Sequence, residues 1–187
     1  MNLLKPSFVK TGWIVFLHSA LIFIFTPSAF SQCMMYPVSL EERVAHSDMI
    51  VMGKLKAKHC YWDRERKNIY TLNIVDITCY LKGNKGKSEV GIITMGGLVN
   101  DKEQITYPSL RIEYYNEYIF FLEKDNRVID NDDYRSGNPE LIQALPYASS
   151  QGAITKQFGF YYDLYGDHKV PEEKMFQQIS KLTNEPA

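Results

Sequence analysis

The chain has 187 residues and a formal net charge of −1, and its composition is 45% hydrophobic and 23% charged. These proportions are ordinary for a globular protein, and they exclude a disordered chain and a polytopic membrane protein. The charge balance has no basic excess, which argues against nucleic acid as a partner. The high content of Tyr (13) and Phe (10) favours β structure.

The N-terminal segment has the order of features found in a secretory signal peptide. Two lysines precede an apolar run over residues 13–25, and small residues follow at Ala29 and Ser31. The run is too short to cross about 30 Å of hydrocarbon as a helix, so we expect cleavage and no membrane span in the mature protein. Cleavage after Ser31 and cleavage after Gln32 both fit the pattern. The protein is therefore predicted to be secreted, or held in the periplasm or cell envelope.

Residues 1–31 are thus assigned to the signal peptide, and residues 32–187 to a single, mainly β domain. A short helix is expected from Ser39, because Glu42 three residues later completes a capping box. A C-terminal amphipathic helix is expected after Pro171, where two glutamates and then apolar residues at helical spacing follow. Apolar patterns predict strands over residues 49–61, 69–81, 90–95 and 117–123, and shorter strands over residues 128–129, 140–145, 152–155 and 158–162.

The two long predicted strands carry the clearest alternation. In the first, every second residue from Val51 to Tyr61 is expected to face the core, and the lysines between them are expected to face water. In the second, the apolar residues change parity between Ile74 and Val75. A change of this kind predicts a β-bulge, which bends a long strand around a barrel.

The three cysteines, Cys33, Cys60 and Cys79, permit one disulfide in an exported chain. The charged turn over residues 63–68 sets a hairpin register in which Cys60 lies opposite about residue 71. That register disfavours a bridge between Cys60 and Cys79 on distance. A bridge from Cys33 to either of the other two cysteines remains open.

Motifs for catalysis or metal binding are not legible. The sequence holds no H-x-x-x-H, C-x-x-C or G-x-S-x-G pattern, so we expect no enzyme activity, no metal and no cofactor. Packing in the core is the expected role of tyrosines 107, 114, 115 and 118, with an exposed aromatic binding surface as the alternative. A solvated loop is the expected form of the acidic stretch over residues 125–133, with a calcium or hydrolase site as the alternative.

The order of several segments carries a resemblance to a known group. Cys33, the stretch LEERVAHSDMIVMGKL over residues 40–55 and YLKG over residues 80–83 resemble the tissue-inhibitor-of-metalloproteinases and netrin-like group. Members of that group are secreted five-stranded barrels of the OB type. The same segments resemble N-terminal domains of secreted proteins from Bacteroidetes-type bacteria. The resemblance covers about residues 33–124, and it implies an OB-type five-stranded barrel between the N-terminal and C-terminal helices.

The resemblance also implies a contact segment and a disulfide. In the inhibitors, the amine and carbonyl of the first Cys chelate the zinc of the target protease. By analogy, Cys33, Met34, Met35 and Tyr36 form the partner-binding segment, and Cys33 pairs with Cys79, with Cys60 as the alternative. The chain departs from the inhibitors, because it has no Cys-x-Cys start and holds three cysteines in all. A mature chain that begins at Gln32 would abolish the chelate.

The expected function is a secreted, non-catalytic module that binds another protein or acts like a metalloprotease inhibitor. Its expected partner is another extracellular or envelope protein, with a metalloprotease among the candidates. The alternative is a structural or assembly domain of the cell envelope without a specific ligand. A third hypothesis is a hydrolase that acts through the acidic stretch.

Overall fold

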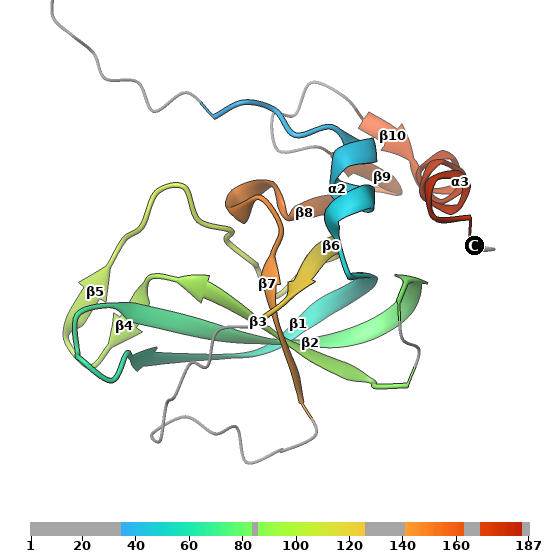
Figure 1. Cartoon of the computed structure of the whole chain (residues 1–187). Helices are drawn as coiled ribbons and strands as arrows, with labels where there is room; N and C mark the ends of the chain where they lie inside the picture. Colours follow the sequence, from blue (N-terminus) through green and yellow to red (C-terminus); the bar gives the residue numbers. More distant parts are fainter. Residues whose placement is uncertain (1–34, 84–85, 126–140, 163–168, 185–187) are drawn as a thin grey trace, which may run out of the picture. The chain divides into compact units, whose positions relative to one another are not determined.

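The computed structural model describes residues 35–83, 86–125, 141–162 and 169–184. The chain divides into two compact units, residues 1–36 and 37–187. The described helices and strands lie in the second unit (Figure 1) and are mainly β, as the composition predicts. In chain order they are α2 (Leu40–His46), β1 (Met49–Trp62), β2 (Ile69–Lys82), β3 (Glu89–Met95), β4 (Gly97–Val99), β5 (Lys102–Gln104), β6 (Glu117–Lys124), β7 (Ile142–Pro146), the 3-10 turn η1 (Ser149–Gln151), β8 (Ala153–Gln157), β9 (Phe160–Tyr162), β10 (Lys169–Pro171) and α3 (Glu172–Thr183).

One large sheet holds most of the strands. Its order is β1-β2-β3-β7-β6-β8-β9-β10, and β1 pairs with β6 as well as with β2. Neighbouring strands are antiparallel, except that β3 and β7 are parallel. The pairings of β1, β2, β3, β7 and β6 therefore lead back to β1, while β8, β9 and β10 extend the sheet from β6. Strands β4 and β5 form a separate hairpin, which lies near the turn between β1 and β2 (Figure 1).

Strand β6 is buried on both faces, as its continuous apolar run predicts. One face belongs to a core cluster between the strands, made of Val51, Leu55, Val75, Val90, Ile92, Leu110, Ile112, Tyr118, Phe120, Leu122, Ala144 and Ala153. We call the strand faces that carry this cluster the core face. The opposite face belongs to a second cluster, which packs against both helices and contains Val44, Ile50, Met52, Leu81, Ile119, Phe121, Ile154, Tyr161, Met175 and Ile179.

Helix α2 is fixed at both ends. At its start, the Ser39 hydroxyl accepts a hydrogen bond of 3.1 Å from the backbone N–H of Glu42, which confirms the predicted cap. At its end, Lys82 Nζ donates to the carbonyl oxygens of Val44 at 2.7 Å and Ser47 at 2.6 Å. The last residue of β2 therefore holds the C-terminus of α2.

Helix α3 begins directly after Pro171 and buries Met175 and Ile179, as the helical spacing predicts. An ion-pair cluster attaches its first turn to the sheet: Lys156 Nζ lies 2.9 Å from a Glu117 oxygen and 2.6 Å from a Glu172 oxygen. Burial lowers the pKa of Lys156, but the hydrogen bonds to these two carboxylates outweigh that effect and raise the pKa above its ordinary value.

The register of β1 and β2 slips where the parity change predicts a bulge. Leu55 pairs with Val75, but Ala57 pairs with Ile74, so the additional residue is Lys56. At this point the slip is thus in β1 and not, as the parity change indicates, in β2, whose own extra residues are Thr78 and Leu81. The pairs between β2 and β3 confirm this, because they run without a slip from residue 70 to residue 76.

The slip in β1 corrects the expected inward face of that strand. Beyond Lys56, the residues on the core face are Lys58 and Cys60, which pair with Asn73 and Thr71. The expectation that Ala57, His59 and Tyr61 continue the inward face is therefore wrong. Tyr61 is buried on the opposite face, in a third cluster with Leu72 and Ile93.

Candidate functional site

The core face changes from apolar to polar towards the hairpin of β4 and β5. On β2, Val75 belongs to the apolar cluster, whereas Asn73 and Thr71 continue the same face with polar side chains. On β3, Ile92 is followed on that face by Thr94, which pairs with Thr71. Asn73, Thr71 and Thr94 are all buried. This polar end of the core face is the physical cause of the parity change in the sequence.

Asn73 is the most deeply buried member of this polar group, with 2% of its surface exposed. Its Nδ2 donates to the carbonyl oxygens of Thr71 at 3.2 Å and Ile92 at 3.0 Å, and to Thr94 Oγ1 at 3.0 Å. Two carbonyl acceptors fix the orientation of the amide, because only the NH₂ end can donate to them. Among the described residues, the amide oxygen Oδ1 accepts no hydrogen bond. Oδ1 is not one of the enclosed polar atoms of the described residues, so it is open to the cavity that Asn73 lines.

The neighbouring polar groups are satisfied within the protein. Thr71 Oγ1 donates to the carbonyl oxygen of Gly96 at 2.6 Å, which uses its only proton. Cys60 Sγ lies 3.3 Å from the same Oγ1, so the thiol is the donor in that contact. Gly97 covers both groups at a φ of +143°, and a Cβ there would lie 2.5 Å from Thr71 Oγ1 and 2.8 Å from Cys60 Sγ. The Gly96–Gly97 pair is therefore required by close approach as well as by conformation.

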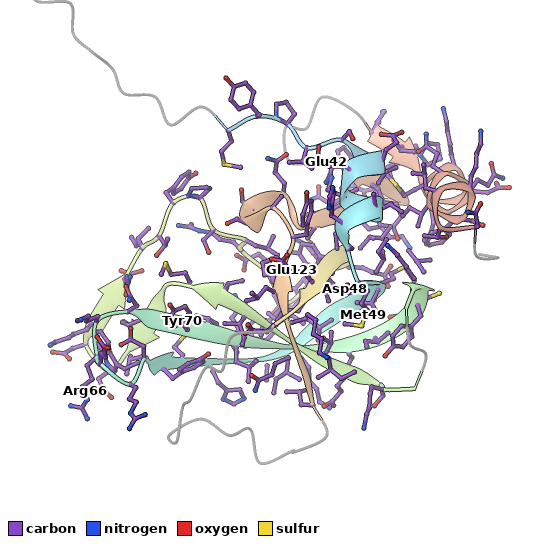
Figure 2. All side chains as sticks on the ribbon, in the orientation of Figure 1. Glu42, Asp48, Met49, Arg66, Tyr70 and Glu123 are labelled. Carbon is purple, nitrogen blue, oxygen red and sulfur yellow. The ribbon has the colours of Figure 1, made fainter. Side chains whose placement is uncertain are left out.

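A cavity of about 330 Å³ lies over this polar floor. Its floor includes Cys60, Thr71, Asn73 and Thr94, and its walls come from the β4–β5 hairpin and from residues 105–113. Figure 2 shows Arg66 in the β1–β2 turn and Tyr70 at the end of the sheet where β4 and β5 lie, whereas Asp48 and Met49 mark the junction of α2 and β1. The cavity and the helix α2 therefore belong to different ends of β1 and β2.

Three of the residues that line the cavity have large apolar side chains that are exposed to solvent. Met95, Leu98 and Ile105 line it and are also exposed, and we call these three residues the apolar rim. Two side chains hold the rim segments in place. Gln104 Oε1 accepts from the backbone N–H of Ile69 at 2.6 Å, and Ser109 Oγ donates to the Met95 carbonyl at 2.9 Å.

The charges that line the cavity are balanced. Lys58 and Arg111 supply positive charge, and Glu103 and Glu113 supply negative charge. Lys58 Nζ also lies 5.7 Å from the centre of the Tyr114 ring, in a cation–π contact. The formal charges of the residues that line the cavity therefore sum to zero.

The expected packing of four tyrosines in the core is wrong for three of them. Tyr107, Tyr114 and Tyr115 are exposed, and Tyr115 is 99% exposed. The expectation is confirmed for Tyr118, which is buried in the first core cluster. The hydroxyl of Tyr118 accepts a hydrogen bond of 2.8 Å from the backbone N–H of Glu113, so it positions the loop that carries its exposed neighbours.

The predicted partner-binding segment remains a prediction. Cys33 and Met34 lie outside the described residues, while Met35 and Tyr36 end the first unit. Within the described residues, Cys60 and Cys79 are not joined by a disulfide. Cys60 lies opposite residue 71, as the turn length predicts, and a bridge from Cys33 stays a prediction. Most of the acidic stretch also lies outside the described residues.

No group of three or more His, Cys, Asp or Glu side chains in the described part of the chain is placed to hold a metal ion. None of the described helices is both long enough and apolar enough to span a membrane.

Sequence inspection did not identify Asn73 and Thr94 as site residues, although the parity change was a signal of them. A polar residue at an inward position of a strand is easily taken for a shift in register. The comparisons with known proteins give no further guide to the site. No family model matches the chain, and neither a curated protein nor a solved structure is significantly similar to it.

Proposed function

We propose that the chain is a secreted or periplasmic, non-catalytic binding module, built on an OB-type five-stranded barrel. Its partner is another extracellular or envelope protein, and metalloproteases are among the candidates. The ring of pairings through β1, β2, β3, β7 and β6 supports the barrel. The order of features in the first 31 residues supports export.

The observation that carries the binding function is the apolar rim. Met95, Leu98 and Ile105 expose large apolar side chains around one cavity, and three tyrosines lie exposed in the segment that follows. Apolar and aromatic side chains that gather around a hollow are typical of protein interaction sites, because they lose water when a partner covers them. An envelope domain without a ligand has no need of such a surface.

The test is affinity capture with the full mature chain from envelope and secreted fractions. The rim variant carries Leu98→Glu and Ile105→Glu, which place charges on exposed positions and should leave the fold intact. The matched control is Phe158→Glu, since Phe158 is 95% exposed in the β8–β9 turn. We expect one protein to be captured by the wild type and the control but not by the rim variant. Equal capture by all three chains would contradict the proposal.

The inhibitor-like form of the proposal needs its own test. Mature protein is assayed against a panel of zinc endopeptidases, with and without residues 33–36. Inhibition that disappears on deletion supports a role for this segment, whereas no inhibition by the intact chain refutes it. The intact mass of the exported protein shows whether the mature chain begins at Gln32 or at Cys33.

A further inference from the structure

We propose that the cavity above Asn73 binds a segment of the partner polypeptide and that this segment places an uncharged hydrogen-bond donor on Asn73 Oδ1. The donor is a backbone amide N–H or a Ser or Thr hydroxyl. The proposal rests on the proposed function, because it assigns the cavity to the same partner that covers the apolar rim.

The requirement for a donor follows from the hydrogen bonds of Asn73. Its Nδ2 is held by the carbonyl oxygens of Thr71 and Ile92, so the amide cannot turn its NH₂ end to the cavity. Oδ1 is the polar atom of this side chain that no described residue satisfies. Oδ1 is not enclosed in the free protein, so a ligand that covers it takes away its access to water. A ligand with a donor replaces that interaction, whereas a ligand that brings only acceptors leaves a buried acceptor without a partner, at a cost of about 1–3 kcal/mol.

The preference for an uncharged group follows from the charge balance. Lys58 and Arg111 on the cavity wall offset Glu103 and Glu113. An ammonium ion that entered would lose its hydration without gaining a net negative field. An anion would face the oxygen of Asn73. A neutral donor avoids both costs.

A polypeptide fits the walls better than a sugar does. Saccharides are commonly held by the flat faces of aromatic rings, but the apolar side chains that line this cavity are aliphatic. A second cavity of about 320 Å³ adjoins the first and shares Thr94, Met95, Thr106, Ser109 and Leu110 with it. Two hollows on either side of one wall suit an extended chain, which can place a side chain in each.

A pair of small probes tests the donor requirement on the full mature chain. N-isobutylacetamide carries one amide N–H beside a branched aliphatic group, and its N-methyl derivative has lost that N–H. Binding is followed by the NMR signals of the Asn73 side-chain amide. It is also followed by the rate at which methyl methanethiosulfonate modifies Cys60, mapped by mass spectrometry. We expect N-isobutylacetamide to shift the signals and slow the modification, and the N-methyl derivative to bind at least tenfold more weakly.

Two further probes test the ligand class. Isobutylammonium and methyl glucoside present a charged donor and a set of sugar hydroxyls. Tighter binding of either one than of N-isobutylacetamide would overturn the proposal, as would equal binding of the two amides. Asn73→Leu, which has about the same volume, should lose the preference for the N–H. If that variant does not fold, the comparison of the two amides on the wild type still decides the question.

The rim variant separates this proposal from the proposed function. If the rim variant loses the partner but neither amide binds the wild type, the binding module stands and the cavity assignment falls. If the amide binds at Asn73 but the rim variant keeps the partner, the proposed function falls, and with it the assignment of the cavity to that partner. Binding of the amide together with loss of the partner supports both.

Discussion

Replacement of Lys82 by Met tests how the end of β2 holds helix α2. Lys82 Nζ donates to the carbonyl oxygens of Val44 at 2.7 Å and Ser47 at 2.6 Å. Within a continuing helix, the Val44 carbonyl would accept from the N–H of Asp48, but that N–H donates to Leu122 instead. In the variant, both carbonyls lose the ammonium donor, and the helix loses a positive charge at its C-terminus.

The expected cost follows from the two charged hydrogen bonds. Each bond to a charged group contributes about 1.5–3 kcal/mol, and the half-exposed position of Lys82 places the value at the low end. Water can replace part of the loss, so we expect a decrease of about 2–3 kcal/mol in the free energy of unfolding. With a denaturant dependence of about 2 kcal/mol per molar, the urea midpoint should fall by about 1–1.5 M. Met keeps the apolar stem of the side chain, so packing changes little.

The assay is urea unfolding followed by circular dichroism, with Lys56→Met as the matched control. Lys56 pairs with Glu89 and Asp76, but it lies at the exposed surface, where ion pairs contribute little. We expect no measurable shift of the midpoint for the control. Amide hydrogen exchange should also accelerate over residues 40–47 in Lys82→Met alone. Equal midpoints for the two variants would refute the reasoning.

Three further predictions concern stability. Ile179→Ala in α3 should lower the free energy of unfolding, measured in urea, by about 2–5 kcal/mol, because Ile179 is fully buried. Leu182→Ala is the control and should lower it much less, because Leu182 is half-exposed. Burial raises the pKa of the Tyr161 hydroxyl above its value in the unfolded chain. The contribution of this hydroxyl to the free energy of unfolding is therefore complete below the unfolded pKa of about 10 and is lost at higher pH. Tyr161→Phe should therefore lose less stability than the wild type between about pH 9 and pH 11. Phe158→Asn should raise the melting temperature, because Phe158 has a φ of +51° in the turn. Asn adopts this left-handed conformation at a conformational energy about 1 kcal/mol lower than Phe does.

Local signals made several elements predictable. The Ser39 hydroxyl and Glu42 are close in sequence, so the cap of α2 can be read without knowledge of the tertiary structure. The spacing of Met175 and Ile179 identifies the buried face of α3 in the same way. The position of Cys60 opposite Thr71 follows from the length of the turn between the two strands.

The candidate site could not be read in this way, because it depends on pairing between distant residues. Asn73 meets Ile92 and Thr94 across the β2–β3 pair, and Cys60 reaches the core face only because of the slip at Lys56. A sequence pattern that assumes unbroken alternation places His59 and not Cys60 on that face. The hairpin that covers the cavity is also short, and its strands hold three residues each, below the length at which periodicity is informative.

The residues that carry the family resemblance have a structural explanation at one end of the sheet. Lys82 caps α2, and Gly83, at a φ of +94°, approaches the Asp48 carbonyl so closely that a Cβ would lie 2.8 Å from it. Gly53 is needed for a similar reason, since a Cβ there would collide with the Asp76 carbonyl. These contacts account for Gly53, Lys82 and Gly83 within the pattern without any ligand. The polar floor and the apolar rim lie at the other end, and the cavity there is lined from residues 58–73 and 94–113. Under the proposed function, the residues that select a partner therefore lie outside the pattern over residues 40–55 and 80–83, and that pattern does not identify the partner.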